Sequence, residues 1–196
     1  MVSYDMAAWR HPISVRGLDK IDRPVGQLLP RADQADKHAT MAEPLHSPNA
    51  MQSECDALAR AVADRMRSRE GAVSTWGVEL EAVRGGYARL AMALRRDMLN
   101  AHGIAHGGMI FALADTAFAY ACNSRNQTTV AQHASITFVS PARLGERLTA
   151  EARETALAGR SGVYDVRVTA GERLVAIYQG LSRTTGGPVL EPGDPS

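Results

Sequence analysis

Cysteine is scarce in this sequence, and charge of one sign is nowhere concentrated. Its two cysteines, Cys55 and Cys122, do not form a CxxC pair, so we expect no disulfide framework and a reduced, cytoplasmic setting. The 22 basic and 21 acidic residues are mixed along the chain. This balance argues against nucleic acid or a membrane surface as the main partner.

Long hydrophobic runs are also absent. The longest apolar stretch, residues 106–122, reads HGGMIFALADTAFAYAC and is interrupted by Asp115. It is shorter than the roughly 20 residues that a membrane-spanning helix needs, so we expect a soluble protein. The chain of 196 residues, 45% of them hydrophobic, is long enough to bury one sizeable core, which favours a single domain.

The first fifty residues differ in composition from the rest. They contain five of the nine prolines, balanced charges and no sustained apolar period. Such a segment buries too little apolar surface to offset its ordering entropy. We expect residues 1–50 to be a mostly disordered N-terminal extension, residues 51–187 to form the domain, and residues 188–196 to be a flexible C-terminal tail.

Apolar periodicity outlines the elements of this domain. Residues 54–69 have helical spacing, and two runs of period two flank a turn at Gly85–Gly86. After the apolar stretch come four alternating runs, near residues 129–139, 146–157, 162–170 and 174–183. Short connections favour antiparallel neighbours. We therefore expect an α+β architecture, with an antiparallel sheet of five or six strands curled around the apolar helix and a second subunit covering the rest.

One stretch resembles a known family signature. Residues 99–124 read LNAHGIAHGGMIFALADTAFAYACNS, which is similar to the signature of the hotdog-fold acyl-CoA thioesterases, and within them the PaaI subfamily associated with phenylacetate catabolism. The looser match covers about residues 54–186. The resemblance implies a hotdog fold, a homodimer or homotetramer, and hydrolysis of an acyl-CoA thioester without a metal or cofactor, CoA being part of the substrate. An aryl-acetyl group, phenylacetyl or ring-hydroxylated phenylacetyl, is the implied acyl part.

Two features of this stretch suit thioester hydrolysis. Gly107 and Gly108 stand at the helix start, where free backbone N–H groups can stabilise the oxyanion of a tetrahedral intermediate. Asp115 is a carboxylate in an apolar setting, which is costly unless the group has a partner or a purpose. No Arg or Lys on the same helix can pair with it. We expect Asp115 either to attack the carbonyl carbon or to take a proton from the attacking water.

Gly107 and Asp115 are too far apart to act on one carbonyl from the same helix. Eight residues at about 1.5 Å each separate them by roughly 12 Å. We therefore expect a shared site, in which Asp115 comes from a second subunit whose helix runs antiparallel about a two-fold axis. The resemblance implies the same design.

Further site residues follow from the resemblance. Asn100 and His106 match positions that line the reacting centre, and Thr116 matches a position whose hydroxyl binds the acid or the water. The first two can equally be satisfied loop residues, and Thr116 can bond back to its own backbone. His102 and His106 have metal-ligand spacing, but no third ligand is evident, so we expect no metal.

The resemblance also implies basic contacts to the CoA phosphates. Arg160, followed by Ser161 and Gly162 in a loop between two strands, matches a position where the family often has a basic residue. Arg143 is a second candidate. The chain departs from the family where many relatives have Arg-Pro and it has Ser140–Pro141.

Two other functions stay open at this point. A hotdog hydratase or dehydratase would act on acyl-CoA with the same fold, although those families resemble different pairings of acid and histidine. A non-catalytic acyl-CoA-binding module would bind the same ligands and would not need Asp115. Release of free thiol separates the thioesterase from both.

Overall fold

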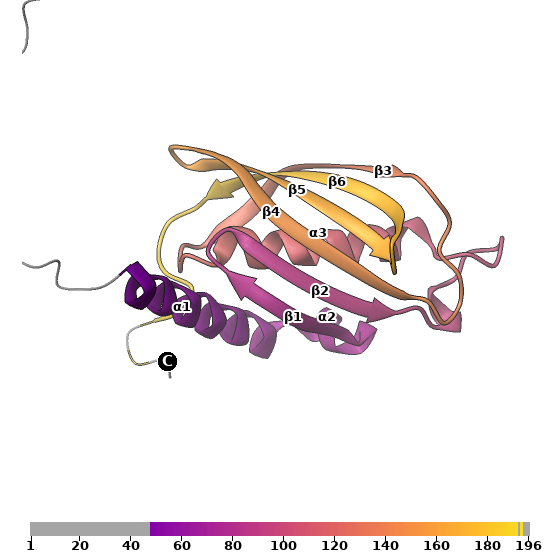
Figure 1. Ribbon diagram of the computed structural model, residues 1–196, viewed down its shortest axis with the longest axis horizontal. Helices are drawn as coiled ribbons and strands as arrows, with labels where there is room; N and C mark the ends of the chain where they lie inside the picture. The colour runs from indigo at the N-terminus through magenta and orange to yellow at the C-terminus, as the bar shows by residue number, and fades with distance from the viewer. Residues whose placement is uncertain (1–47, 192, 194–196) are drawn as a thin grey trace, which may run out of the picture. The chain divides into compact units, whose positions relative to one another are not determined.

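The computed structural model describes residues 48–191 and residue 193 (Figure 1). Most of the expected N-terminal extension therefore lies outside the described residues. Helix α1 spans Pro48–Arg69, so it begins earlier than the periodicity from residue 54 indicated. Proline is well tolerated in the first turn of a helix, because the N–H that it lacks would have no partner there. The short helix α2, Gly71–Trp76, follows.

The domain is built on one six-stranded antiparallel sheet, with the strand order β1-β2-β4-β5-β6-β3 (Figure 1). The strands are β1 Val78–Arg84, β2 Tyr87–Ala93, β3 Thr129–Phe138, β4 Arg147–Ala158, β5 Ser161–Ala170 and β6 Arg173–Thr184. Strand β3 does not pair with its sequence neighbours. It crosses to the far side and pairs with β6, so β1 and β3 are the two edges.

Alternation explains why these runs form a sheet with one buried face. In β5, Tyr164, Val166 and Val168 are buried while Arg167 between them is exposed. A strand with period two turns its apolar side chains to a single face. The turn from β1 to β2 depends on Gly86, which has φ +70, a region that favours glycine.

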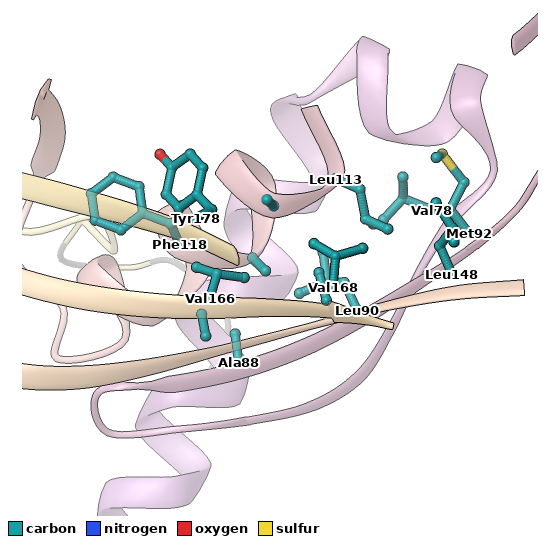
Figure 2. Close-up of a cluster of buried hydrophobic side chains, with 14 of the residues drawn as sticks. Val78, Ala88, Leu90, Met92, Leu113, Phe118, Leu148, Val166, Val168 and Tyr178 are labelled. Atoms are coloured by element: carbon teal, nitrogen blue, oxygen red, sulfur yellow. The ribbon is translucent and has the colours of Figure 1, made fainter. Parts of the chain in front are cut away.

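Helix α3, Gly107–Asn123, lies against the buried face of the sheet and contacts all six strands (Figure 1). Leu113 and Phe118 of this helix are buried among side chains from the strands (Figure 2). Burying one side chain of this size stabilises the folded state by about 1.5–3 kcal/mol. The packing of the helix on the sheet is therefore a main source of the domain's stability. The expected architecture, a sheet around a central helix, is confirmed.

One face of α3 is not covered by its own sheet. Gly108 is exposed, and Phe111, Ala112, Asp115 and Thr116 are half-buried. Their spacing of three and four residues puts them on one side of the helix. A single subunit therefore encloses only part of the helix that the sequence led us to expect buried all round. We call these five residues the open face of α3.

The segment after β6 lies against the domain. The backbone N–H groups of Val189 and Leu190 donate to Asn126 Oδ1 at 3.0 and 2.8 Å. Of the expected tail, residues 192 and 194–196 lie outside the described residues. Within the described part of the chain, no helix combines the length and apolarity needed to cross a membrane.

Candidate active site

A tight turn built on Asn100 precedes α3. Asn100 Oδ1 accepts hydrogen bonds from the backbone N–H groups of His102 at 2.9 Å and Ile104 at 3.4 Å. The backbone N–H of Asn100 donates to the carbonyl of Ile104 at 2.8 Å, which closes the turn. These bonds fix the amide oxygen, and Nδ2 has no acceptor among the described residues. Asn100 therefore keeps two N–H donors for a ligand.

His106 caps the start of α3. Its Nδ1 accepts a hydrogen bond of 3.0 Å from the backbone N–H of Gly108, so the proton of the neutral ring is on Nε2. The N–H groups of Met109 and Ile110 donate to the His106 carbonyl. The Gly107 N–H is thus the donor of this first turn that has no partner among the described residues. We expected both glycine N–H groups to face the site, but the cap uses that of Gly108.

A pocket of about 480 Å³ lies beside Gly107. It is lined by Asn100, Ile104, Ala105, Gly107, Ile110, Phe138, Val139, Ser140, Pro141 and Ala142. The Phe138 ring lies over Gly107, where a Cβ would stand 3.0 Å from Phe138 Cζ. The missing side chain lets the Phe138 ring approach the start of α3 this closely. Gly107 and Asn100 both line this one pocket.

Asp115 lies outside that pocket, on the open face of α3. Its Oδ1 accepts a hydrogen bond of 2.6 Å from the hydroxyl of Tyr178 on β6. Tyr178 is fully buried, and burial, followed by the bond to Asp115, raises the pKa of its hydroxyl, which therefore stays protonated and donates. Asp115 Oδ2 accepts no hydrogen bond from the described residues.

Sequence reasoning missed Tyr178. We looked for a partner of Asp115 among basic residues of the same helix, whereas the partner is a neutral donor 63 residues away. The alternating run near residues 174–183 did hold a signal, because Ala176, Tyr178 and Gly180 occupy its inward positions. A hydroxyl on an inward position needs a buried acceptor.

Thr116 is half-buried beside Asp115, and its hydroxyl donates to the carbonyl of Ala112 at 2.7 Å. This is the bond back to the helix that the sequence left open as the alternative. The oxygen can still accept a hydrogen bond. Within one chain, then, Asp115 and Thr116 adjoin each other and stand apart from the pocket at Gly107.

The proposed CoA contacts around Arg160 lie near the other end of α3. Arg160 Nε and one terminal nitrogen donate to the carbonyls of Thr184 and Thr185 at 2.9 and 3.1 Å. Arg160 lines a second pocket, of about 440 Å³, with Asn126 and other residues that follow the helix. Since α3 has 17 residues, its two ends are about 25 Å apart.

The neighbours of Arg160 have packing roles. Ser161 begins β5 and its Oγ accepts from an Arg183 nitrogen at 3.4 Å, so Ser161 belongs to a strand and not to a loop. Gly162 is buried, and a Cβ there would stand 2.8 Å from Ser182 Oγ and from a Tyr164 ring carbon. Its missing side chain is needed for packing within the sheet.

At Ser140–Pro141, where many relatives have Arg-Pro, a basic side chain comes from β6 instead. Arg173 donates to Ser140 Oγ at 2.8 Å and to the Pro141 carbonyl, and it pairs with Glu146 at 2.6 Å. The exposed Arg143 follows Pro141 and Ala142, which line the Gly107 pocket, so it is the predicted basic contact near that pocket.

Among the described residues, no three His, Cys, Asp or Glu side chains gather closely enough to hold a metal ion. His102 and His106 are both exposed, and Nδ1 of His106 is engaged by the helix cap. Hydrolysis without a metal or cofactor stays a prediction.

Comparison with known proteins identifies the family. Residues 102–177 match the family model of the thioesterase superfamily. The acyl-coenzyme A thioesterase PaaI of Escherichia coli is 37% identical over 128 residues, which are 65% of this chain and 91% of that protein. The chain belongs to the PaaI-type acyl-CoA thioesterases.

Solved structures agree with this assignment. The E. coli PaaI protein from the phenylacetic acid degradation operon matches with a TM-score of 0.67 and 35% identity, over 68% of this chain and 98% of that one. A hypothetical thioesterase from Streptococcus pneumoniae, solved with coenzyme A, matches with a TM-score of 0.55 and 27% identity, over 57% of this chain and 90% of that one. The hotdog fold is confirmed, and the PaaI-type chain is a thioester hydrolase.

Proposed function

We propose that this protein hydrolyses aryl-acetyl-CoA, such as phenylacetyl-CoA or a ring-hydroxylated phenylacetyl-CoA, to the free acid and CoA. The E. coli relative is named an acyl-coenzyme A thioesterase and comes from the phenylacetic acid degradation operon. The S. pneumoniae relative was solved with coenzyme A. These names support a CoA thioester as the substrate and favour an aromatic acyl group.

The observation that carries the proposal is the N–H of Gly107, which has no partner among the described residues and stands beside an open pocket at the start of α3. A thioester carbonyl oxygen seated there meets this donor and the positive end of the helix dipole. The Asn100 amide, in the same pocket lining, offers a second donor. Preorganised donors of this kind stabilise the developing oxyanion, each by about 2.7–4 kcal/mol where measured by mutation.

Asp115 reaches this carbonyl from a second subunit. The open face of α3 and the edge strand β3 together form a surface on which a second copy can pack about a two-fold axis. Two large apolar residues of β3 support this surface, since Val130 is 48% exposed and Phe138 51% exposed in one chain. Antiparallel pairing of two α3 helices brings Asp115 of the partner subunit towards Gly107. The resemblance to PaaI enzymes implies that such dimers pair into tetramers.

Two routes for Asp115 give the same products. As a nucleophile, Asp115 Oδ2 attacks the thioester carbon, the C–S bond breaks, the CoA thiolate leaves and takes a proton, and water hydrolyses the resulting anhydride. As a general base, Asp115 takes a proton from a water whose oxygen attacks the same carbon, and the same C–S bond breaks. Thr116, with its free acceptor lone pairs, adjoins either reacting oxygen.

In this proposal the CoA part and the acyl part of the substrate extend in different directions from the thioester carbonyl at Gly107. Arg143 is the cation closest in sequence to the pocket lining, and Arg160 of the partner subunit is the second candidate for the phosphates. The acyl group lies along α3, where the small side chains of Ala112 and Ala119 leave room and Phe111 offers an aromatic surface.

A thiol-release assay across short, branched, long and aromatic CoA esters tests the proposal. We expect a higher kcat/KM for phenylacetyl-CoA and its ring-hydroxylated forms than for palmitoyl-CoA. A clear preference for palmitoyl-CoA would refute the aryl-acetyl assignment and leave the thioesterase in place. Water addition to an enoyl-CoA without thiol release would favour a hydratase, and binding without turnover would favour a binding module.

A further inference from the structure

Asp115 is held by a residue from a different element of its own chain. The Tyr178 hydroxyl donates to Oδ1 at 2.6 Å, and no other described group bonds to the carboxylate. A carboxylate attached through one oxygen loses rotational freedom, while its second oxygen stays available. In Asp115 that second oxygen, Oδ2, belongs to a half-exposed residue on the open face of α3.

The Tyr178 ring is itself fixed. It makes an edge contact with Phe111 at 5.4 Å between ring centroids and a tilted contact with Phe118 at 5.9 Å. Phe111, Asp115 and Phe118 are spaced by four and three residues, so they form one ridge of α3 with the carboxylate in the middle. Figure 2 shows Phe118 and Tyr178 side by side at one end of the core cluster.

The backbone of β6 also favours this placement. Gly180, two residues beyond Tyr178 on the same side of the strand, lies beneath Phe118, and a Cβ there would stand 2.8 Å from the Phe118 ring. The glycine lets Phe118 approach the strand closely. Phe118 in turn supports one side of the Tyr178 ring, so the hydroxyl has little freedom to leave Asp115.

We infer that Tyr178 is a positioning residue, whose buried hydroxyl holds Oδ1 of Asp115 so that Oδ2 is the oxygen presented to the substrate. This inference rests on the proposed catalytic role of Asp115. It applies to both routes, because Oδ2 is the attacking atom in one and the proton acceptor in the other. The Tyr178 hydroxyl, whose pKa is raised by burial, stays a donor at working pH, and both routes require a carboxylate that can accept its hydrogen bond.

Tyr178→Phe removes this one oxygen and keeps the buried ring. Because a hydrogen bond to a charged group is strong, we expect kcat to fall by about 10- to 100-fold. Because the Tyr178 side chain is fully buried and offers no surface to the substrate, KM should stay within about two-fold. Circular dichroism and thermal melting check that the variant is folded.

Tyr164→Phe is the matched control. Tyr164 lies on the neighbouring strand β5, is 1% exposed, and donates its hydroxyl to Glu154 Oε2 at 2.8 Å. This variant also loses a hydroxyl that bonds a carboxylate, but the carboxylate is that of Glu154 and not that of Asp115, and the ring that packs on Phe118 is kept. It should lose stability to a similar extent and retain kcat. Equal losses of kcat in both variants would show a general effect on the sheet and overturn the inference.

A double-mutant cycle with Asp115→Asn separates the inference from the proposed function. If Tyr178 acts through Asp115, adding Tyr178→Phe to Asp115→Asn should change the residual rate by less than about two-fold. If the double variant instead shows the product of the two single-variant rate losses, the two residues act independently and the inference is overturned. The same holds if Tyr178→Phe keeps the wild-type kcat while Asp115→Asn is inactive. Neither result would affect the proposed role of Asp115. Full activity in Asp115→Asn would instead overturn the role of Asp115, and this inference with it.

Discussion

Two inactive variants should restore activity to each other if the active site is shared between subunits. Asp115→Asn removes the reacting group and keeps the size and hydrogen-bonding capacity of the side chain. Gly107→Val places a branched side chain in the proposed carbonyl seat. We expect each variant alone to lose several orders of magnitude in kcat, because each removes part of the reacting centre.

The geometry of α3 sets the expected outcome of mixing them. A carbonyl oxygen must lie about 3 Å from the Gly107 nitrogen, and the carbonyl carbon about 3–3.5 Å from the attacking oxygen. The two protein groups can therefore be roughly 6–7 Å apart in a working site. Along one helix they are about 12 Å apart. In a hybrid dimer with shared sites, one site then carries both defects and the other carries none.

Gly107→Val should fold, which the assay requires. Gly107 is not among the glycines with positive φ, so a β-branched residue meets no backbone strain there. The contact of its Cβ is with the Phe138 ring, at 3.0 Å. Phe138 is 51% exposed, so the ring can move aside without opening a cavity. The substitution blocks the seat while leaving the core untouched.

Hybrids carrying two different affinity tags can be purified after subunit exchange and assayed for thiol release. They should have about half of the wild-type activity per dimer, and an equal unpurified mixture about a quarter, because half of the dimers are hybrids. Hybrids of wild type with Asp115→Asn also contain one intact site and calibrate the half-activity level. Inactive hybrids of verified composition would show that Gly107 and Asp115 act within one chain, and would refute the reasoning from helix length.

Two further outcomes follow from burial. Because burial raises the pKa of the Cys122 thiol to about 12, a disulfide reagent at pH 8 should titrate the exposed Cys55 in the native protein, and both thiols only after denaturation. Burial also raises the pKa of Glu70 above 4.5, an effect that its hydrogen bond from Tyr120 partly offsets. The folded state then binds more protons, so this group lowers stability as pH rises through the raised pKa. Glu70→Gln should raise Tm relative to wild type more at pH 8 than at pH 5, and an equal change at both would contradict this.

The strongly periodic parts of the fold could be predicted from the sequence. The runs near residues 146–157 and 162–170 correspond to β4 and β5 with ends shifted by at most one residue, because one buried face enforces their alternation. The start of α1 could not be placed, because its first turns are exposed and carry no apolar period. Helix ends of this kind depend on caps and packing more than on hydrophobic pattern.

The candidate site could be predicted only in part, because some of its contacts join residues close in the sequence and others join residues far apart. A local sequence motif was enough to group Asn100, His106 and Gly107, because they lie within eight residues of one another. Which glycine N–H stays free depends on the rotamer of His106, which no spacing reveals. The pairing of Tyr178 with Asp115 depends on the register of β6 and on the rotation of α3 together. The alternation of β6 therefore indicates that Tyr178 points inward, but it does not identify the partner.

The Tyr178 bond also explains how an aspartate is tolerated in an apolar helix before any partner is present. A half-buried carboxylate needs a donor in the folded subunit, and Tyr178 supplies it within the same chain. The carboxylate therefore has a hydrogen-bond partner within its own subunit, whereas the proposed reaction requires a second subunit. The stabilising contact uses Oδ1 and the proposed reaction uses Oδ2, so a single side chain meets both demands at once. For this reason Asp115→Asn, which can still accept the Tyr178 hydrogen bond, should lose turnover without losing the fold.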